Sequence, residues 1–424
     1  MSLLPARRRR NVVLAVAVLL AVIAAACAGE DSGDGEPDED QAADQPQEDP
    51  DAEEPAEPAE PEEQDGDAGD GSDEATAELF DEIVEEVAEL RDLPVEAEVP
   101  MEVVSAEEIT DIALADAEDE LEEIARSEAI AKALHQIPED TDLLELNEQL
   151  IEAGVAGIYV PEDERAYVVG DDDEELSPLE QVTVAHEVVH GLQDRFIDLT
   201  VLDGFEDDPD GAMAFSSLIE GDASQLQERW ASTHLSEEEQ QQRYAEEQQM
   251  GAEQLETLGD LPPALLESFV APYTAGPAFI EGITADQEDT DAIDAALEDP
   301  PETMLEVFDP AAYQEGFEPE PVEVGAIPEG YERTADWTWG AFEVALMLEL
   351  TDEQAVDPQL IQAWRGGRLA GFQPGEGEQA VVAVGWAFAD EDAAGQMCEV
   401  VADWHATVAD GEATDDPDVL RGPD

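Results

Sequence analysis

Apolar side chains first recur at helical spacing after residue 76. Steps of three and four residues separate them, which predicts an amphipathic helix over residues 76–92. The positions are Leu79, Phe80, Ile83, Val84, Val87 and Leu90. Residues 95–104 then have strand character, and residues 106–135 return to a helical pattern. The chain after residue 76 therefore opens with a helix, a short strand and a longer helical region.

Two β-rich runs follow, at residues 156–160 and 166–169. The polar segment 161–165 joins them, and this arrangement predicts a β-hairpin. After an acidic loop, Ser177 and Glu180 have the spacing of a capping box, with Pro178 at the first helical position. We therefore predict that a helix starts at Ser177.

The C-terminal part, residues 300–424, predicts a second mixture of helix and strand. A helix is expected around 337–350, then strands at 368–372 and 380–389 joined by a turn, and a final helix ending near His405. Cys398 lies in the apolar pattern of that last helix and is expected to be buried. The whole pattern predicts a mostly helical α+β protein with a small mixed sheet and an α+β C-terminal region.

The N-terminus has the pattern of an export signal. Four arginines, residues 7–10, precede an apolar run over 12–26 that is short for a mature membrane span. The run ends at Cys27, which resembles a bacterial lipoprotein signal in which this cysteine is lipidated, although Ala24 stands where Leu is commoner. A signal cut after Ala26, a retained anchor and a choice between general and twin-arginine export remain open.

Charge changes this picture in two ways. The chain has 113 Asp+Glu against 15 Lys+Arg, a formal net charge of -98, which excludes nucleic acid as a partner. Residues 28–75 are acidic, contain no base and have no apolar side chain larger than Pro, so we expect a disordered linker. The remaining body is also acidic and contains one lysine, Lys132, which favours a protein adapted to high salt. A GC-rich genome would explain the scarcity of lysine but not the excess of acids.

The predicted helix at Ser177 carries His186, Glu187 and His190. Histidines four residues apart present both imidazoles to one point, and Glu187 lies beside that point. This is the arrangement that binds Zn²⁺, lowers the pKa of a bound water to about 7, and supplies a general base for attack on a carbonyl. Two solvated histidines on an acidic helix are the alternative. The opposite stripe of the helix is apolar and predicted to be buried: Val182, Ala185, Val189, Leu192 and Phe196.

A third ligand is needed, and the best candidate is Glu220. Phe196 occupies the position six residues after His190, so a third histidine of the metzincin type is excluded. Glu220 lies among apolar neighbours on a second helical pattern, where a carboxylate is costly unless it binds something. It ranks ahead of His234 and Glu228, although an ordinary acid remains the alternative at this position.

Together these residues resemble the gluzincin, or thermolysin-type, zinc metallopeptidases. The chain resembles more closely an uncharacterised group of secreted bacterial proteins with the same HExxH motif, over matching stretches that span most of residues 76–407. The resemblance implies a zincin-like fold, Zn²⁺ held by His186, His190 and Glu220, and Glu187 as base. It also implies that residues 166–169 form an edge strand beside the HExxH helix, along which an extended substrate pairs.

Two further roles are expected around this site. Thermolysin-type enzymes place an Asp four residues after the ligand Glu, but here that residue is Ser224. Asp194 or Asp222 is therefore expected to accept a hydrogen bond from a ligand histidine. Tyr273 is the candidate donor to the oxyanion of the transition state, with an ordinary packed tyrosine as the alternative.

These expectations divide the chain into a lipoprotein signal peptide (1–27), a linker (28–75), a zincin-like metallopeptidase domain (76–299) and a C-terminal α+β region (300–424). The expected function is a zinc-dependent peptidase outside the cytoplasm, anchored by lipid at Cys27 to the outer face of the bacterial membrane and acting on peptides or proteins. A zinc-binding lipoprotein without proteolytic activity and a small-ester or amide hydrolase remain the alternatives. The oligomeric state is not predicted.

Overall fold

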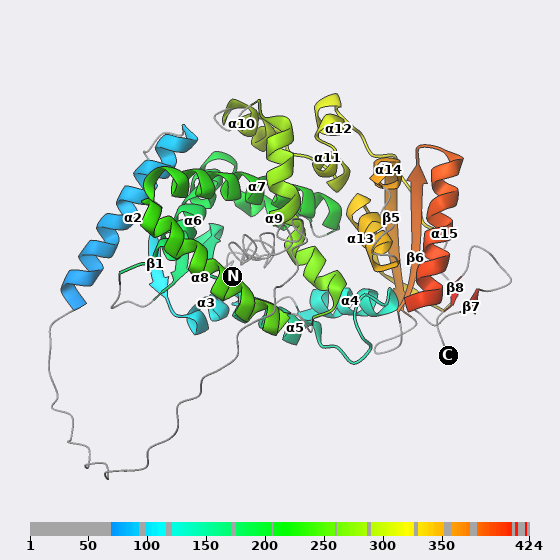
Figure 1. The fold of residues 1–424 in the computed structure, drawn as a ribbon. Helices are drawn as coiled ribbons and strands as arrows, with labels where there is room; N and C mark the ends of the chain where they lie inside the picture. The colour runs from blue at the N-terminus through cyan, green and yellow to red at the C-terminus, as the bar shows by residue number, and fades with distance from the viewer. Residues whose placement is uncertain are drawn as a thin grey trace, which may run out of the picture.

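The fold is that of a computed structural model of the chain (Figure 1). The structure describes residues 69–92, 99–115, 121–170, 175–205, 207–258, 261–285, 290–325, 330–351, 358–373, 380–408, 412–413 and 420–421. The expected signal peptide, Cys27 and the linker as far as residue 68 lie outside these residues. Within the described part the protein is mostly helical, with two three-stranded sheets and one two-stranded ribbon, so the expected α+β class is confirmed.

The amphipathic pattern predicted over residues 76–92 forms helix α2, Gly69–Arg91, so residues 69–75 belong to this helix and not to the expected disordered linker. Strand β1 (Met101–Val104) follows, and then the expected helix over 106–135 is divided into two. Helix α3 is Ala106–Ala113, helix α4 is Leu121–Ala133, and helix α5 is Leu143–Gly154. Ile83 and Val87 of α2 are almost fully buried in the main core. The apolar stripe of α2 therefore packs onto the body of the protein.

The predicted hairpin forms strands β2 (Gly157–Val160) and β3 (Arg165–Val169), joined by the short 3-10 turn η2 (Pro161–Asp163). The two strands pair antiparallel, with Ile158 opposite Tyr167. Strand β1 pairs parallel with the other side of β3, which gives the mixed sheet order β1-β3-β2. The expectation of an edge strand at residues 166–169 is therefore wrong. β3 is the central strand because β1 pairs with one of its sides and β2 with the other. β2 is the edge strand beside helix α6.

Helix α6 (Pro178–Ile197) begins at the predicted capping box. The Ser177 side chain accepts from the Glu180 N–H, and the Glu180 carboxylate accepts from the Ser177 N–H. Every residue from Val182 to Gln193 is buried, so the helix runs through the core with no face open to solvent. Phe196, expected in the buried stripe, is instead 38% exposed because it lies in the last turn of α6, beyond the core.

Turn η3 (Leu199–Phe205) leads into the long helix α7, Pro209–His234, which packs against α6. Helices α8 (Glu237–Leu258) and α9 (Pro263–Ile283) follow. Helices α7 and α9 cross closely at two glycines. A Cβ built on Gly276 would lie 2.2 Å from the carbonyl oxygen of Ser217, and one on Gly221 would lie 2.4 Å from that of Gly276. Only glycine permits this approach of the two backbones.

A second core cluster joins helices from both sides of residue 300. Phe279 and Ile280 of α9 pack with Met304 and Val307 of α11 and with Phe342 of α13. The elements are α10 (Thr290–Glu298), α11 (Met304–Phe308), α12 (Pro310–Glu315) and α13 (Ala341–Thr351). Apolar packing thus continues from the expected metallopeptidase domain into the expected C-terminal region.

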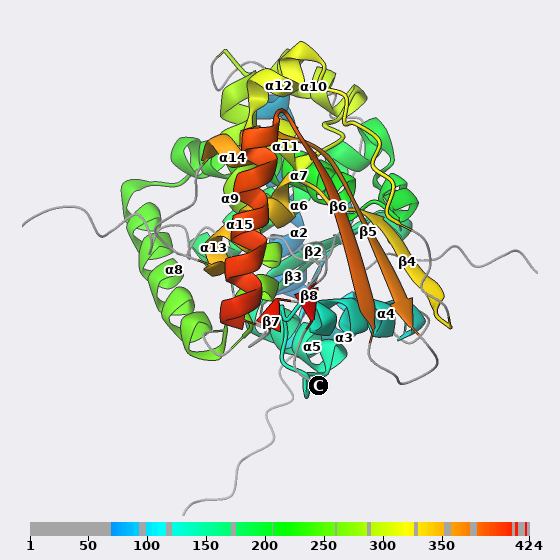
Figure 2. The ribbon, with the colours of Figure 1, turned by 90° about the vertical axis from the view of Figure 1, so that its right-hand side faces the viewer.

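The C-terminal region contains an antiparallel sheet of order β4-β5-β6 (Figure 2). Its strands are β4 (Glu332–Thr338), β5 (Trp364–Gln373) and β6 (Val381–Phe388), with α14 (Pro358–Gln362) before β5. Helix α15 (Glu391–Val408) packs on α13 and β6, while Ile130 of α4 packs against Leu369 of β5. A small ribbon pairs β7 (Glu412–Ala413) with β8 (Leu420–Arg421).

Two C-terminal expectations need correction. Residues 337 and 338 belong to strand β4 and not to a helix, because they pair with Leu369 and Arg368 of β5. Cys398 is exposed, since Ala393, Met397 and Trp404 form the buried stripe of α15 and Cys398 lies about 100° around the helix from Met397. Among the described residues, no helix has the length and apolar content needed to span a membrane.

Candidate metal centre

The two histidines of α6 meet Glu220 of α7 at one point. His186 Nε2 lies 3.2 Å from Glu220 Oε2 and 3.0 Å from His190 Nε2, and His190 Nε2 lies 3.5 Å from the same carboxylate oxygen. These are the three residues that the sequence indicated as ligands. The side chains are buried, and the most exposed of them, Glu220, is 6% exposed.

The spacing of these atoms suits a small cation. In a tetrahedral zinc site with bonds of about 2.0–2.1 Å, neighbouring ligand atoms lie about 3.3 Å apart. The three observed separations, 3.0, 3.2 and 3.5 Å, fall on both sides of that value. Two imidazole nitrogens and one carboxylate oxygen are also a donor set typical of a zinc hydrolase. The buried His186, His190 and Glu220 group could therefore hold a metal ion.

Two glutamines fix the orientation of the imidazoles. Gln193 Oε1 lies 3.0 Å from His190 Nδ1, and Gln227 Oε1 lies 2.7 Å from His186 Nδ1. The amide nitrogen of Gln193 donates to the Ile219 carbonyl and to Asp222, so its oxygen must be the atom that faces His190. An amide oxygen only accepts, and therefore Nδ1 carries the proton and Nε2 offers its lone pair to the metal site.

This hydrogen-bonded chain continues to helix α2. The Asp222 carboxylate accepts from Gln193 Nε2 at 3.0 Å and from Arg91 Nε at 3.2 Å. Arg91 is 1% exposed and forms a second ion pair with Asp294 of α10 at 2.7 Å. Asp222 thus supports His190 through Gln193. The orientation of a ligand on α6 depends on residues of α7, α2 and α10.

Asp194 does not contact a ligand histidine, contrary to expectation. Its carboxylate accepts from the Tyr159 hydroxyl at 2.8 Å and from the Leu199 N–H at 2.8 Å. It lies one turn beyond His190, where α6 gives way to η3, so it fastens the end of the helix to β2. Asp222, the alternative candidate for this contact, does not reach a histidine directly, because Gln193 lies between them. Gln193 and Gln227 form the hydrogen bonds to the histidines that were expected of Asp194 or Asp222.

Glu187 is fully buried beside this group, and neither carboxylate oxygen forms a hydrogen bond of normal geometry. The backbone N–H of Tyr159 is the donor that lies toward it. Burial raises the pKa of Glu187 to about 8, against the opposing effect of nearby His190. A Cβ on Gly157 would lie 2.8 Å from Glu187 Oε1, so a glycine in β2 leaves room for this side chain.

The electrostatics of the group follow from burial and from Glu220. Burial would raise the pKa of Glu220, but His190 and His186 outweigh it and lower the value to about 2. Burial would lower the pKa of His190, but the Glu220 carboxylate outweighs it and raises the value to about 9. Burial prevails at His186 and lowers its pKa. The two Nε2 atoms, 3.0 Å apart, both lie beside the Glu220 carboxylate, in a position that could hold a cation.

Tyr273 of α9 also reaches the site. Its side chain is partly buried, and its hydroxyl lies toward the Glu220 carboxylate. Burial, followed by the charges of Glu220 and Glu187, raises the pKa of Tyr273 well above its usual value. The close crossing at Gly221 and Gly276 explains this placement. Gly221 is adjacent to Glu220, and Tyr273 precedes Gly276 by about one helical turn.

The competing ligand candidates lie elsewhere. His234 Nδ1 lies 2.8 Å from Glu86 Oε1, and its ring stacks on Trp230. Glu228 forms a bidentate pair with Arg243, at 2.9 and 3.1 Å. Both residues therefore have partners outside the metal centre.

Sequence reasoning missed Gln193, Gln227 and Arg91. Gln193 is followed by Asp194 and Arg195, and Gln227 is followed by Glu228 and Arg229, so in sequence both look like ordinary solvent-facing positions. Arg91 is 131 residues from Asp222 in sequence, so no local pattern could have paired them. In comparisons with known proteins, no family model, curated protein or solved structure matches the chain significantly.

Proposed function

We propose that this chain is a zinc-dependent peptidase that works outside the cytoplasm. The observation that carries the proposal is Glu187, a carboxylate 0% exposed with no normal hydrogen bond, adjacent in sequence to His186. Protein folds rarely keep an unpaired carboxylate in the core without a use for it. Beside a metal centre of two histidines and one glutamate, Glu187 would have a use as a general base.

Each residue has a place in the proposed reaction. His186, His190 and Glu220 would hold Zn²⁺, and Gln193 and Gln227 keep the lone pairs of the imidazoles directed at it. When bound, Zn²⁺ supplies the Lewis acidity that activates water and polarises a carbonyl. Glu187 accepts the proton of the attacking water and passes it to the leaving amine. Tyr273 donates a hydrogen bond to the oxygen that gains charge in the transition state.

An edge strand supports a peptide as the substrate. In the antiparallel β2–β3 pair, Ala156 accepts from Val169, so backbone groups alternate and those of Gly157 and Tyr159 face away from β3. The Tyr159 N–H faces Glu187. An extended peptide that paired with this edge would bring a carbonyl to the metal centre.

Metal content tests the ligand assignment. We expect about one zinc per chain in the unmodified full chain and in Glu187→Gln, and almost none in Glu220→Ala, because two ligands bind zinc far more weakly than three. Glu228→Gln is the matched control on the same helix, since its partner is Arg243, and it should retain zinc. Equal zinc in Glu220→Ala and Glu228→Gln would contradict the site.

Hydrolysis tests the catalytic assignment. A peptide library digested in high salt should be cleaved by the unmodified chain and at least about 100-fold more slowly by Glu187→Gln, the loss typical of a general base. Zinc binding without any Glu187-dependent cleavage would overturn the peptidase proposal.

A second candidate function is zinc binding without proteolysis, in an envelope lipoprotein. The burial of the site favours it, since the ligands and Glu187 are no more than 6% exposed. The intact base favours the peptidase, because a binding protein has no use for Glu187. A small-ester or amide hydrolase that uses the same metal is a third candidate. Adding small esters and amides to the digest tests it, because such an enzyme would hydrolyse these compounds and leave the peptides uncut.

The location rests on the sequence. We propose lipidation at Cys27 and anchoring to the outer face of the membrane, with the acidic linker as a spacer. Metabolic labelling with palmitate tests this, because Cys27→Ser should lose both the label and membrane association. A labelled Cys27→Ser chain would exclude this anchor.

A further inference from the structure

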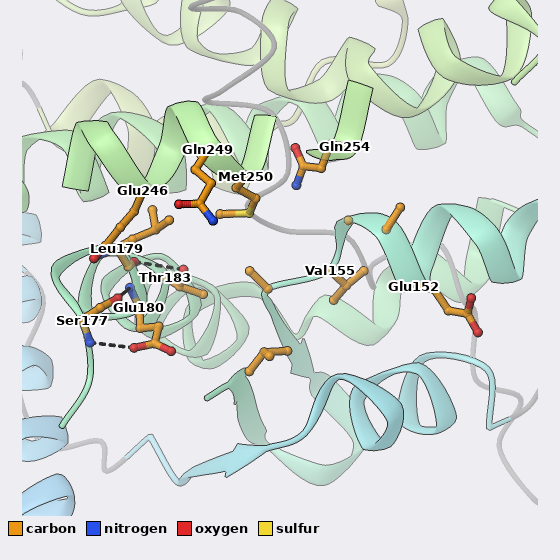
Figure 3. Close-up of a pocket in the computed structure, with 14 residues that line it drawn as sticks. Glu152, Val155, Ser177, Leu179, Glu180, Thr183, Glu246, Gln249, Met250 and Gln254 are labelled. Atoms are coloured by element: carbon orange, nitrogen blue, oxygen red, sulfur yellow. Dashed lines mark hydrogen bonds between the residues drawn. The ribbon is translucent and has the colours of Figure 1, made fainter. Parts of the chain in front are cut away.

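A cavity of about 350 Å³ lies between helix α8, the start of α6 and the segment that leads from α5 into β2 (Figure 3). Pockets that bind small ligands have volumes of about 300–1,000 Å³. Apolar side chains form part of the wall, among them Val155, Leu179 and Met250. The cavity is large enough for one amino-acid side chain and part of the backbone that carries it.

The cavity adjoins the proposed catalytic base. Thr183 lines it and precedes Glu187 by four residues of α6, a rise of about 6 Å. Ala156 also lines it, and the next residue, Gly157, packs directly against Thr183 and Glu187. Two residues of an extended peptide span about 6.6 Å. A substrate whose reacting carbonyl lies at Glu187 would therefore place a nearby side chain at this cavity.

Gln254 of α8 is the unusual residue of the lining. Its side chain is 3% exposed, and among the described residues neither its amide nitrogen nor its amide oxygen has a hydrogen-bond partner. A buried amide with both functions unpaired is costly to the folded protein, and native structures keep few of them. Figure 3 shows this amide on the side of α8 that faces α5 across the cavity.

The chemistry of Gln254 selects the complementary group. A cation would satisfy only the amide oxygen, and a carboxylate would satisfy only the amide nitrogen. A neutral carboxamide satisfies both at once. The carboxylates of Glu180 and Glu246, also in the lining, already accept from Ser177 N–H, Leu179 N–H and Gln242 Nε2, and they would repel an acidic ligand.

We infer that this cavity is a substrate-binding subsite for a neutral carboxamide side chain, glutamine or asparagine, close to the bond that is cut. The inference rests on the proposed peptidase function for its biological meaning. It concerns binding, however, and can be measured apart from cleavage. Gln254 binds the substrate amide, and the apolar wall receives the methylene groups that carry it.

The test uses short polyalanine peptides with one variable residue, labelled with fluorescein, and the full chain with Glu187→Gln loaded with Zn²⁺ in high salt. The variable residue is glutamine, norleucine or glutamate, three side chains of similar length. Fluorescence anisotropy should show the glutamine peptide bound about tenfold more tightly than the norleucine peptide, with the glutamate peptide weakest. Equal affinities, or no binding of any peptide, would overturn the subsite without any mutation in the cavity.

A second variant assigns the preference to Gln254. In Gln254→Leu we expect the norleucine peptide to bind at least as tightly as the glutamine peptide. Gln248→Leu, at an exposed position of the same helix, is the matched control and should keep the tenfold preference. An unchanged preference in a folded Gln254→Leu chain would overturn the assignment.

Failure of the subsite is distinguishable from failure of the peptidase. Cleavage of peptides by the unmodified chain without preference for glutamine would leave the peptidase standing and exclude the subsite. A glutamine preference in binding without any cleavage would support the subsite and exclude the peptidase.

Discussion

The side-chain oxygen of Gln193 lies 3.0 Å from Nδ1 of His190, and the nitrogen of the same amide donates to Asp222. One glutamine therefore fixes both the tautomer and the orientation of the imidazole of His190, a candidate metal ligand. Its own orientation depends on Asp222, which Arg91 holds from the far end of helix α2. The orientation of His190 in the candidate metal centre is thus supported by residues from three helices, α6, α7 and α2.

Loss of this hydrogen bond should weaken metal binding. We expect Gln193→Ala to lower zinc affinity by about 10–100-fold, as is typical when the partner of a ligand histidine is removed. Competition with a chromophoric chelator measures this. Gln225→Ala is the control, because Gln225 donates to the Pro277 carbonyl and touches neither histidine. Equal affinities in the two variants would show that Gln193 does not support the ligand.

The close crossing of α7 and α9 should not tolerate a methyl group. In Gly276→Ala the new Cβ would lie 2.2 Å from the Ser217 carbonyl oxygen, so the helices must separate. We expect a loss of about 1–3 kcal/mol in the free energy of unfolding, measured by urea denaturation. Gly395→Ala is the control within helix α15, where the added Cβ meets nothing within 4 Å. That variant should instead gain about 0.5–1 kcal/mol from its better helix propensity.

Two buried carboxyls outside the metal centre should make stability depend on pH. Burial raises the pKa of Glu343 to about 7, and nearby Asp208 adds to the shift. Burial and the charge of Glu343 raise the pKa of Asp210 well above its usual range. The folded state therefore keeps protons that the unfolded chain releases above about pH 4.5. The contribution of these two carboxyls to stability is greatest below that pH and is lost as the pH rises through about 7.

Thermal melts between pH 5 and pH 8 should show this loss. We expect it to be smaller in Glu343→Gln, because the amide carries no charge and its oxygen can still accept from the Gly340 N–H. Glu332→Gln, at an exposed position of β4, is the matched control and should follow the unmodified chain. A loss as steep in Glu343→Gln as in the control would exclude this carboxyl as its source.

The charge of -98 should make stability depend on salt. Acidic side chains cover a body with few bases, so their mutual repulsion opposes the compact state. Raising NaCl from about 0.1 M to about 1 M shortens the screening length from about 10 Å to about 3 Å, and the melting temperature should rise. Sucrose controls for general stabilisation by cosolutes. A higher melting temperature at low salt would contradict adaptation to concentrated salt.

The local sequence pattern was sufficient to predict several helices and strands. The capping box at Ser177 and Glu180 placed the start of α6, because both of its hydrogen bonds join residues three apart. The hairpin of β2 and β3 also depends on neighbours in sequence. Glu220 was found because a carboxylate among apolar residues is costly, and this cost can be read from the adjacent side chains.

The sequence by itself thus determined the helix that carries His186, Glu187 and His190, the hairpin beside it and the strongly acidic composition. Only the tertiary structure decided that β3 is the central strand, that Gln193 and not Asp194 orients His190, and that the site is buried. Strand order, hydrogen-bond partners and burial are contacts between distant segments. They depend on how the helices and strands pack in three dimensions, which no periodicity along the chain encodes.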